Sequence, residues 1–332
     1  MKAIVLLSGG LDSTLVARII KNEGIEAIAL NFKTPFCLCD GKASSGCFSH
    51  SRKVAQDLGV EFRVMNVAED FFRIVENPRH GYGSNMNPCI DCRILKFSKA
   101  KAFMQEAGAS FIVTGEVVGQ RPMSQHKATL AIIDKESGLE GLVLRPLSAQ
   151  LLPETIPEKE GWISRQKMLG FSGRGRRPQM ELAKAFHIKD YPCPAGGCLL
   201  TDPAFSKRIR DLMQYDKLSL NNVELLKVGR HFRLSPKARL VVGRNELENA
   251  RLDALKEPKD HLFMPKETAG PTALGRGQFS EELICFSCGI VSHYCDGHSG
   301  RAVDIVYNNG AAEERVLATF ALAEDKIAVL RI

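Results

Sequence analysis

Hydrophobic and polar positions alternate in the first half of the chain in the pattern of a mixed α/β domain. Short apolar runs indicate strands at 2–7, 27–32, 62–65, 111–114 and 128–133. Amphipathic periodicity indicates helices between them, at 11–21, 51–58 and 94–107. This alternation predicts an α/β fold with a doubly wound parallel sheet, whose ligands bind at the carboxyl ends of the strands.

The pattern changes after residue 150. Residues 150–220 are polar and helical in character, with the clearest helices at 178–186 and 205–215. From Asn221 the chain reads as a compact α+β region, with strands at 232–234 and 238–242, a helix at 245–255 and further short strands to Ile332. We therefore expect three parts: a catalytic domain over 1–165, a helical basic extension over 166–220, and a smaller α+β domain over 221–332.

The first strand is joined to the first helix by a short polar loop, SGGLDST. Its glycines permit backbone conformations that other residues avoid, and its hydroxyls lie beside the unpaired amides of the first helical turn. Such a turn binds anions, and phosphate is the expected one. The spacing fits neither a Walker A loop nor a G-x-G-x-x-G turn. The residues concerned are Ser8, Gly9, Gly10, Asp12, Ser13 and Thr14.

Composition and charge narrow the class of protein. Of 332 residues, 44% are hydrophobic and 25% charged, and no apolar run is long enough to cross a membrane or to form a signal peptide. We therefore expect a cytoplasmic protein with no membrane partner. The formal net charge is +7, and basic residues concentrate in 165–177, 207–210 and 227–239. Such clusters suit either a polyanion such as RNA or a solvated basic face.

Ten cysteines in a reducing compartment point to metal or sulfur chemistry rather than disulfides. Cys89 and Cys92 form a C-x-x-C pair, and the neighbouring cations Arg93 and Lys96 favour charged sulfurs. Cys198, which follows two glycines, is a candidate third ligand. Three thiolates on a four-iron cluster would leave one iron open to bind sulfide. A four-thiolate zinc or closed cluster that includes Cys193, and a metal-free redox pair of Cys89 and Cys92, are the alternatives.

Two other groups of cysteine and histidine have ligand-like spacing. The first, in a glycine- and serine-rich loop, could bind zinc, accept sulfur or belong to a flexible lid; it comprises Cys37, Cys39, Cys47 and His50. The second is expected in a strand-turn setting and is a candidate for structural Zn²⁺; it comprises Cys285, Cys288, His293, Cys295 and His298.

Five segments in order resemble the PP-loop ATP pyrophosphatase family, and within it the tRNA thiouridylases, over about residues 1–215. They are SGGLDST, NPCIDCRILKF, VTGEVVGQRPMSQ, GLVLRPLSAQ and PAGGCLLTDP. The resemblance implies a HUP-type (adenine nucleotide alpha hydrolase-like) fold and the use of ATP and Mg²⁺ to adenylate a uridine carbonyl oxygen in tRNA. Sulfur from sulfide or a persulfide donor protein then replaces AMP. Iron–sulfur members hold a [4Fe-4S] cluster on three cysteines, here Cys89, Cys92 and Cys198.

The same resemblance assigns roles to residues. The catalytic set is Asp12, Cys89, Cys92 and Cys198, and the ATP-binding set is Ser8, Gly9, Gly10, Asp12, Ser13, Thr14, Gly115 and Arg121. Arg121 and Arg145 follow predicted strand ends and are candidates to clamp the pyrophosphate. Gln120, Ser124 and Gln125 are expected to contact nucleotide or uracil. Wobble-uridine enzymes commonly have aspartate in place of Cys89, and a persulfide variant uses a pair matching Cys92 and Cys198, so 2- and 4-thiolation both stay open.

The segment KVGRHFRLSPKARLVVGRNELENARL resembles the small RNA-associated (NFACT-R-like) domain of ribosome-quality-control and fibronectin-binding-like proteins. Its basic residues would face phosphate; they are Lys227, Arg230, His231, Arg233, Lys237, Arg239 and Arg244. A basic surface for domain packing is the alternative. Across the chain, the residues expected to bind RNA are Arg174, Arg176, Arg177, Lys207, Arg208, Arg230 and Arg233.

Two rival functions fit parts of the sequence. A zinc-dependent 7-cyano-7-deazaguanine synthase-like enzyme shares the SGGLDST loop, but that family groups its four cysteines closely, whereas Cys92 and Cys198 lie far apart here. A non-catalytic iron–sulfur RNA-binding sensor is the second rival. Asp12 and Ser13 are both present, which argues against a sensor that has lost ATP chemistry.

Overall fold

The chain forms two compact units, Met1–Thr201 and Asp202–Ile332. The computed structural model describes residues 1–38, 46–191, 197–297, 300–310 and 314–332. Within these ranges, no helix combines the length and apolar character needed to cross a membrane. The division falls earlier than the boundary expected near Asn221, and each unit is described by itself below.

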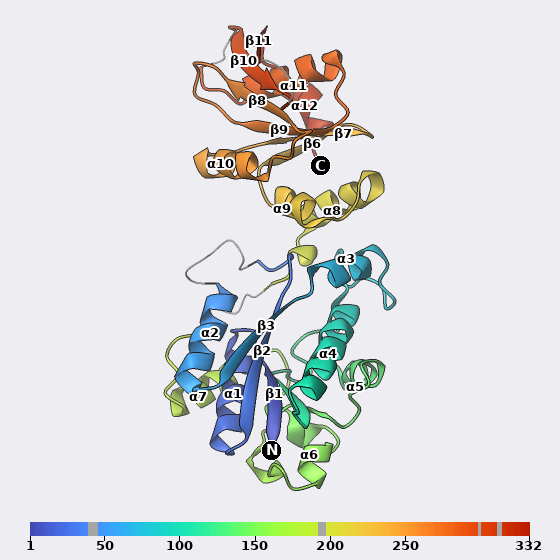
Figure 1. The fold of residues 1–332 in the computed structure, drawn as a ribbon, viewed down its shortest axis with the longest axis vertical. Helices are drawn as coiled ribbons and strands as arrows, with labels where there is room; N and C mark the ends of the chain where they lie inside the picture. The colour runs from blue at the N-terminus through green and yellow to red at the C-terminus, as the bar shows by residue number, and fades with distance from the viewer. Residues whose placement is uncertain (39–45, 192–196, 298–299, 311–313) are drawn as a thin grey trace. The chain divides into compact units, whose positions relative to one another are not determined.

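The first unit is built on a five-stranded, fully parallel sheet in the order β3-β2-β1-β4-β5 (Figure 1). The strands are β1 (Lys2–Leu6), β2 (Glu26–Lys33), β3 (Glu61–Asn66), β4 (Phe111–Thr114) and β5 (Val143–Leu144). The chain winds outward from β1 to β3 and then returns to the other side of β1 with β4. The carboxyl ends of β1 and β4 therefore form a topological switch point, where open α/β sheets bind ligands.

Helices cover both faces of this sheet, as expected of a doubly wound α/β fold (Figure 1). One face carries α1 (Leu11–Asn22), α2 (Cys47–Leu58) and α7 (Arg177–Ala185); the other carries α4 (Cys89–Glu106) and α5 (Lys127–Glu136). The unit also contains α3 (Ala68–Glu76) and the short α6 (Ile156–Lys159). Alternate residues of β1 enter the two cores, with Val5 packing on one side and Ile4 on the other.

One expected strand of this unit is wrong. Residues 128–133 lie within the helix α5, and the fifth strand is the short β5. Leu130 and Ile133, three residues apart, are fully buried, whereas Ile132 between them is 42% exposed. That burial pattern is helical, and the apolar run was too short to distinguish the two periodicities.

The segment 166–201 packs with the first unit rather than forming part of a separate basic extension. Ala183 of α7 is buried in the core beside α1, and Phe171 and Leu182 pack against it. The polar composition of this segment concealed an apolar face on α7, which the core covers. Only residues after Thr201 group with the second unit.

The second unit is an α+β fold with a six-stranded antiparallel sheet in the order β11-β10-β8-β9-β7-β6. Its strands are β6 (Arg230–Ser235), β7 (Ala238–Val242), β8 (His261–Pro265), β9 (Ala273–Gly277), β10 (Val303–Asn308) and β11 (Arg315–Thr319). Its helices are α8 (Pro203–Tyr215), α9 (Leu220–Leu226), α10 (Glu246–Leu255), α11 (Glu281–His293) and α12 (Glu324–Ala328).

The helix α11 corrects the expectation of short strands alone from residue 256 to the C-terminus. Ser280 caps it by accepting a hydrogen bond from the amide of Leu283, and its buried residues pack on the sheet. The rest of the expected architecture, a parallel α/β sheet followed by a smaller α+β domain, is confirmed.

Candidate active site

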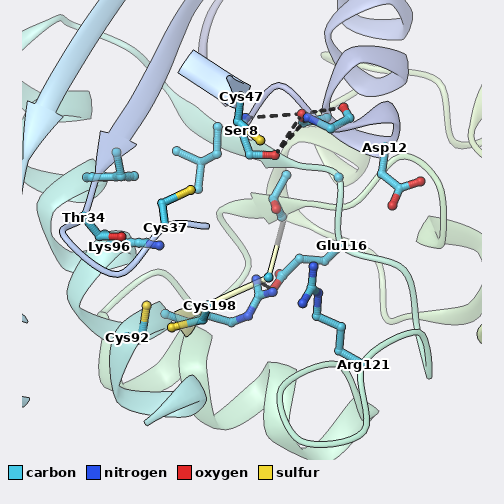
Figure 2. Close-up of a pocket in the computed structure, with 18 of the residues that line it drawn as sticks. Ser8, Asp12, Thr34, Cys37, Cys47, Cys92, Lys96, Glu116, Arg121 and Cys198 are labelled. Atoms are coloured by element: carbon cyan, nitrogen blue, oxygen red, sulfur yellow. Dashed lines mark hydrogen bonds and ion pairs between the residues drawn. The ribbon is translucent and has the colours of Figure 1, made fainter. Parts of the chain in front are cut away.

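A cavity of about 1000 Å³ opens at the carboxyl end of the parallel sheet (Figure 2). It is lined by the residues that follow β1, β2 and β4, including Ser8, Thr34 and Gly115. The cavity therefore lies at the topological switch point.

The loop from Ser8 to Thr14 is closed by its own hydroxyl groups. The hydroxyls of Ser13 and Thr14 donate to the carbonyl oxygen of Gly10 at 2.9 and 3.1 Å, and the backbone amide of Ser8 donates to the Ser13 hydroxyl at 3.2 Å. These bonds fix the first turn of α1, whose remaining amides are of the kind that can bind an anion. Ser8, Gly10, Asp12 and Ser13 line the cavity, while the Thr14 side chain serves the loop itself.

Two glycines are required where this loop meets its neighbours. Gly9 has φ +80°, and a Cβ there would lie 2.2 Å from the carbonyl oxygen of Cys47. At Gly115 a Cβ would lie 2.6 Å from the carbonyl carbon of Asp12. Both contacts are shorter than any real Cβ contact, so only glycine fits at either position.

Asp12 faces the cavity from the first turn of α1 (Figure 2). Its Oδ2 accepts a hydrogen bond from Gln120 Nε2 at 3.0 Å, and its Oδ1 is buried with no hydrogen-bond partner in the described structure. Burial raises the pKa of this carboxyl group, against the opposing effects of Gln120, Arg176 and Arg121. A buried carboxylate oxygen with an open coordination position beside phosphate-binding amides is a fitting Mg²⁺ ligand.

Further polar groups of the first unit are buried without hydrogen-bond partners in the described structure. They are the Ser124 hydroxyl, the Gln125 Oε1 atom and both amide atoms of Gln179. Gln125 lines the cavity and Gln179 lies close enough to Asp12 to lower its pKa, so these two residues are placed to meet a polar ligand. Gln179 was missed by the sequence analysis, since a glutamine in a polar helix carries no recognisable signal; Arg176, which lines the cavity, had been assigned only to RNA.

Cys89 and Cys92 occupy the first turn of α4, three residues apart on one helical face. Both line the cavity, and Asn87 Nδ2 donates a hydrogen bond to Cys89 Sγ at 2.9 Å. The N-terminus of a helix stabilises negative charge, so this position suits thiolate ligands.

Cys198 reaches the same cavity from a segment distant in sequence (Figure 2). Asn85 Nδ2 donates to the carbonyl oxygen of Thr201 at 2.8 Å, and the amide of Met86 donates to that of Leu200 at 3.0 Å. The residues just before α4 therefore hold the segment that carries Cys198. These bonds bring the three predicted cysteine ligands to one cavity.

Burial, rather than neighbouring cations, dominates the acidity of these thiols. It raises the pKa of Cys198 to about 12, against the smaller opposing effect of Lys96, and it raises the pKa of Cys89 against Arg93. Lys96 and Arg93 do lower the pKa values of Cys198 and Cys89, respectively, as expected, but burial raises these values by more. Without a metal, Cys198 is a protonated thiol at neutral pH; a bound metal would hold it as a thiolate.

Within the described residues, no three Cys, His, Asp or Glu side chains are placed to hold a single metal ion. Cys89, Cys92 and Cys198 nevertheless all line the same cavity. Cys193 lies outside the described residues, so the four-thiolate alternative stays untested.

Arg145 does not fit its expected role as a pyrophosphate clamp. Its guanidinium is only 4% exposed and donates to Glu116 Oε2 at 2.9 Å and to Asp134 Oδ1 at 2.7 Å. Burial opposes its charge, but the two carboxylates outweigh burial and raise the pKa of Arg145. Glu116 also pairs with Arg93, next to Cys92, so this network supports the wall of the cavity. Arg121, in contrast, lines the cavity as expected.

Replacing Arg145 with methionine is expected to lower the free energy of unfolding by roughly 3–5 kcal/mol, because the half-buried Asp134 would lose its partner and the buried Glu116 would keep only Arg93. Denaturant titration measures the change. Arg177→Met is the matched control: its pair with Glu181 is exposed, and the loss should stay below about 1 kcal/mol. Equal effects of the two substitutions would contradict a buried structural role for Arg145.

The basic residues expected to bind RNA fall into three groups. Arg174 and Arg176 line the cavity, and Arg177 is exposed on α7. Several in the second unit are engaged internally: Arg208 donates to the carbonyl of Leu226, Arg230 to that of Gly243, and Arg233 to the carboxylate of Asp211. Lys207 is exposed, with its Nζ bonded to the carbonyl of Arg331.

Two residues of the predicted phosphate-facing set are wrong. His231 and Arg239 are each 2% exposed. His231 Nε2 hydrogen-bonds the carbonyl oxygen of Val228, and Arg239 Nη2 donates to the Asn222 side chain. All of β7 is buried, and His231 lies in the buried part of β6, so neither side chain can reach RNA phosphates.

The second candidate zinc group is not assembled in the described structure. Cys285 and Cys288 lie on the helix α11 rather than in a strand-turn setting, Cys295 donates to the carbonyl of Val291, and His293 Nδ1 hydrogen-bonds the carbonyl of Leu322. His298 lies outside the described residues. In the first group, Cys39 lies outside the described residues as well, and Cys37 and Cys47 line the main cavity.

Two family matches, one to each unit, agree with this geometry. Residues 1–156 match the family described as the tRNA methyl transferase HUP domain, and residues 229–330 match the NFACT protein RNA binding domain. Each unit therefore contains one matched segment, to the HUP domain family in the first unit and to the NFACT domain family in the second. Both resemblances drawn from the sequence motifs are confirmed at this level.

Curated relatives of the first unit are named tRNA-specific 2-thiouridylase MnmA. The protein from Bartonella quintana is 29% identical over 148 residues, which cover 41% of this chain and 35% of the relative. The protein from Geobacter metallireducens is 31% identical over 127 residues, 34% of each chain. The matched region thus spans about a third of the length of these relatives.

Solved structures show more distant similarity. A 4-thiouridine synthetase in complex with RNA and ATP is 22% identical, with 61% of this chain and 45% of that chain covered at a TM-score of 0.42. The U34-tRNA thiolase NcsA from Methanococcus maripaludis, solved with its [4Fe-4S] cluster, is 17% identical, with 64% and 66% covered at a TM-score of 0.34.

Proposed function

We propose that this protein is an ATP-dependent tRNA sulfurtransferase, which adenylates a uridine carbonyl oxygen and replaces that oxygen with sulfur. One observation carries the proposal: the phosphate-binding loop and Cys89, Cys92 and Cys198 line the same cavity. The names of the curated relatives and the family match of residues 1–156 support the same class of reaction.

The loop residues supply the nucleotide site. The amides of the first turn of α1 and the Ser8 hydroxyl would bind the pyrophosphate part of ATP, and Asp12 Oδ1 would hold Mg²⁺. Arg121 and Arg176 act electrostatically on Asp12 and line the cavity, so they would offset the charge that grows on the departing pyrophosphate. Arg121 also acts electrostatically on Cys89, so it would serve both the nucleotide and the sulfur chemistry.

The reaction proceeds in two displacements. The uridine carbonyl oxygen attacks the α-phosphorus of ATP, forms a new O–P bond and releases pyrophosphate. Sulfur then attacks the activated carbon, and AMP leaves with the former carbonyl oxygen. Adenylation is needed because the carbonyl oxygen alone is a very poor leaving group, whereas a phosphate monoester is stabilised by its charge distribution.

Cys89, Cys92 and Cys198 are the residues that would hold a [4Fe-4S] cluster. Such a cluster on three thiolates has one iron without a protein ligand, which can bind sulfide. Asn87 Nδ2 donates to the Cys89 sulfur, and the Leu200 amide donates to the Cys198 sulfur and lowers the pKa of that thiol against burial. Donors of this kind orient sulfur ligands and stabilise their charge.

We further propose that the second unit holds tRNA, because residues 229–330 match an RNA-binding domain. The candidate phosphate contacts that remain from the predicted sets are Arg174, Arg176 and Arg177 of the first unit and the exposed Lys207, Lys237 and Arg244 of the second. The sulfur source is proposed to be sulfide or a persulfide donor protein, and the setting the cytoplasm.

The test combines two readouts on the full chain, purified and reconstituted with iron and sulfide without oxygen. Pyrophosphate release is measured with and without unthiolated tRNA, and the tRNA is digested and analysed for thiouridine by mass spectrometry. We expect tRNA to stimulate pyrophosphate release and thiouridine to form. Stimulation by deazaguanine carboxylate alone would instead favour the nitrile-forming enzyme. Absence of any ATP turnover would favour the non-catalytic sensor.

A further inference from the structure

Cys37, which the proposed reaction does not use, lies directly opposite Cys198. The two residues form an isolated antiparallel bridge. The amide of Leu38 donates to the carbonyl of Gly197 at 3.2 Å, and the amide of Leu199 donates to that of Phe36 at 2.8 Å. Because these bonds flank the pair rather than join its members, Cys37 and Cys198 are a non-hydrogen-bonded antiparallel pair.

This backbone arrangement is suitable for a disulfide. Residues in such a pair have Cα atoms about 4.5 Å apart and side chains closer than in the alternate pair. Disulfides join residues whose Cα atoms are about 4.4–6.8 Å apart, so side-chain rotation alone would bring the two sulfurs within bonding distance. Both residues carry thiols in the structure and both line the cavity (Figure 2), so small oxidants reach them from the same space.

We propose that Cys37 and Cys198 form a reversible disulfide across this bridge. With a peroxide as oxidant, one thiol is converted to a sulfenic acid as the O–O bond breaks and water leaves. The second thiol attacks the sulfenic sulfur, forms the S–S bond and releases a second water. A small dithiol reverses the change by exchange, regenerating both thiols while its own sulfurs become a disulfide.

The consequence for activity rests on the proposed function. A disulfide removes the Cys198 sulfur from the set that would hold the cluster, while Cys89 and Cys92 remain on α4. Oxidation would therefore stop sulfur transfer without altering the phosphate-binding loop. The Cys37–Cys198 bond itself requires only the two thiols, so it can be tested apart from catalysis.

The experiment uses the full chain with Cys39 and Cys193 both replaced by serine. Tryptic peptides 34–42 and 190–207 then contain only Cys37 and Cys198, respectively. The protein is purified without cluster, treated with an equimolar amount of hydrogen peroxide, alkylated and digested without reductant. We expect the major cross-linked species to join these two peptides, with a mass lower by two hydrogen atoms than their sum, and to disappear with dithiothreitol. When Cys37→Ser is added to this double-serine protein, the cross-linked species should become undetectable. Adding Cys47→Ser instead should leave its amount unchanged.

Cluster loading supplies the second readout. After peroxide treatment, reconstitution with iron and sulfide should fail in the protein with Cys37 and succeed in its Cys37→Ser variant, and dithiothreitol should remove the difference. A dominant link between Cys198 and peptide 80–93, which contains Cys89 and Cys92, would overturn the inference, as would no link at all. If the disulfide forms but no preparation thiolates tRNA, the proposed function is wrong and the disulfide inference holds. If tRNA is thiolated but no disulfide forms, the proposed function holds and the disulfide inference is wrong.

Discussion

Cys198→Ala is expected to abolish cluster binding and tRNA thiolation while leaving ATP binding intact. The substitution removes one of three sulfur ligands, and loss of a ligand should reduce thiolation by more than about a hundredfold, since even residues that merely orient ligands contribute about 10–100-fold. ATP affinity should persist because the loop from Ser8 to Thr14 is held by its own hydrogen bonds. Iron and sulfide analysis, thiouridine analysis and calorimetry with ATP measure the three properties.

Cys285→Ala is the matched control for this variant. Cys285 is an exposed cysteine on α11 in the second unit, outside the cavity. Its replacement should leave iron content, thiolation and ATP affinity unchanged. If the Cys198→Ala variant still thiolates tRNA, then the Cys198 sulfur is not required for the reaction, whatever the iron content of the variant.

The loop between β1 and α1 could be predicted because its signal is local. The glycines, hydroxyls and helix start lie within a few residues, and the structure closes the loop with bonds between Ser13, Thr14 and Gly10. The parallel sheet was predictable for a similar reason, since buried parallel strands appear as short apolar runs. Residues 128–133 show the limit of predicting strands from apolar runs, because a short apolar segment of a helix can have the same local composition as a strand.

The arrangement of the cysteines depends on contacts that the sequence does not display. Asn85 and Met86 hold the segment of Cys198 through backbone groups of Thr201 and Leu200. One bond uses the Asn85 side chain and the other only backbone groups, and neither has a recognisable sequence pattern, so only the glycines before Cys198 and the family resemblance joined it to Cys89 and Cys92 in advance. The position of Cys37 opposite Cys198 follows from other backbone bonds, those of Leu38 to Gly197 and of Leu199 to Phe36, and had no sequence signal.

Charge was the least informative part of the sequence. Arg145 follows a strand end, as a catalytic arginine would, but it is enclosed by Glu116 and Asp134. In the second unit, Arg233 pairs with Asp211 and stacks over the Tyr215 ring at 4.8 Å. A count of basic residues does not show which of them meet carboxylates after folding, so it overestimated the surface available to RNA.

Gly9→Ala is expected to eliminate productive ATP binding, and Gly24→Ala separates the two physical causes. Both glycines have positive φ, +80° and +71°, so alanine costs about 1–2 kcal/mol of stability at either position. Only Gly9 also faces the backbone of Cys47, 2.2 Å from the added Cβ, whereas Gly24 faces open space.

Relief of the contact at Gly9 requires the loop or the start of α2 to move, and a displacement of about 1 Å in a catalytic site costs about a hundredfold in rate. Backbone strain should therefore lower the thermal stability of both variants by a similar amount. Gly9→Ala should lose additional stability because of the contact with Cys47. Only Gly9→Ala should also show an at least hundredfold decrease in tRNA-stimulated pyrophosphate release. Thermal denaturation and pyrophosphate release measure the two effects. Equal pyrophosphate release by both variants would contradict this prediction. It would show that the contact between the loop and Cys47 is not needed to position the phosphates, and that the first-turn amides of α1 suffice.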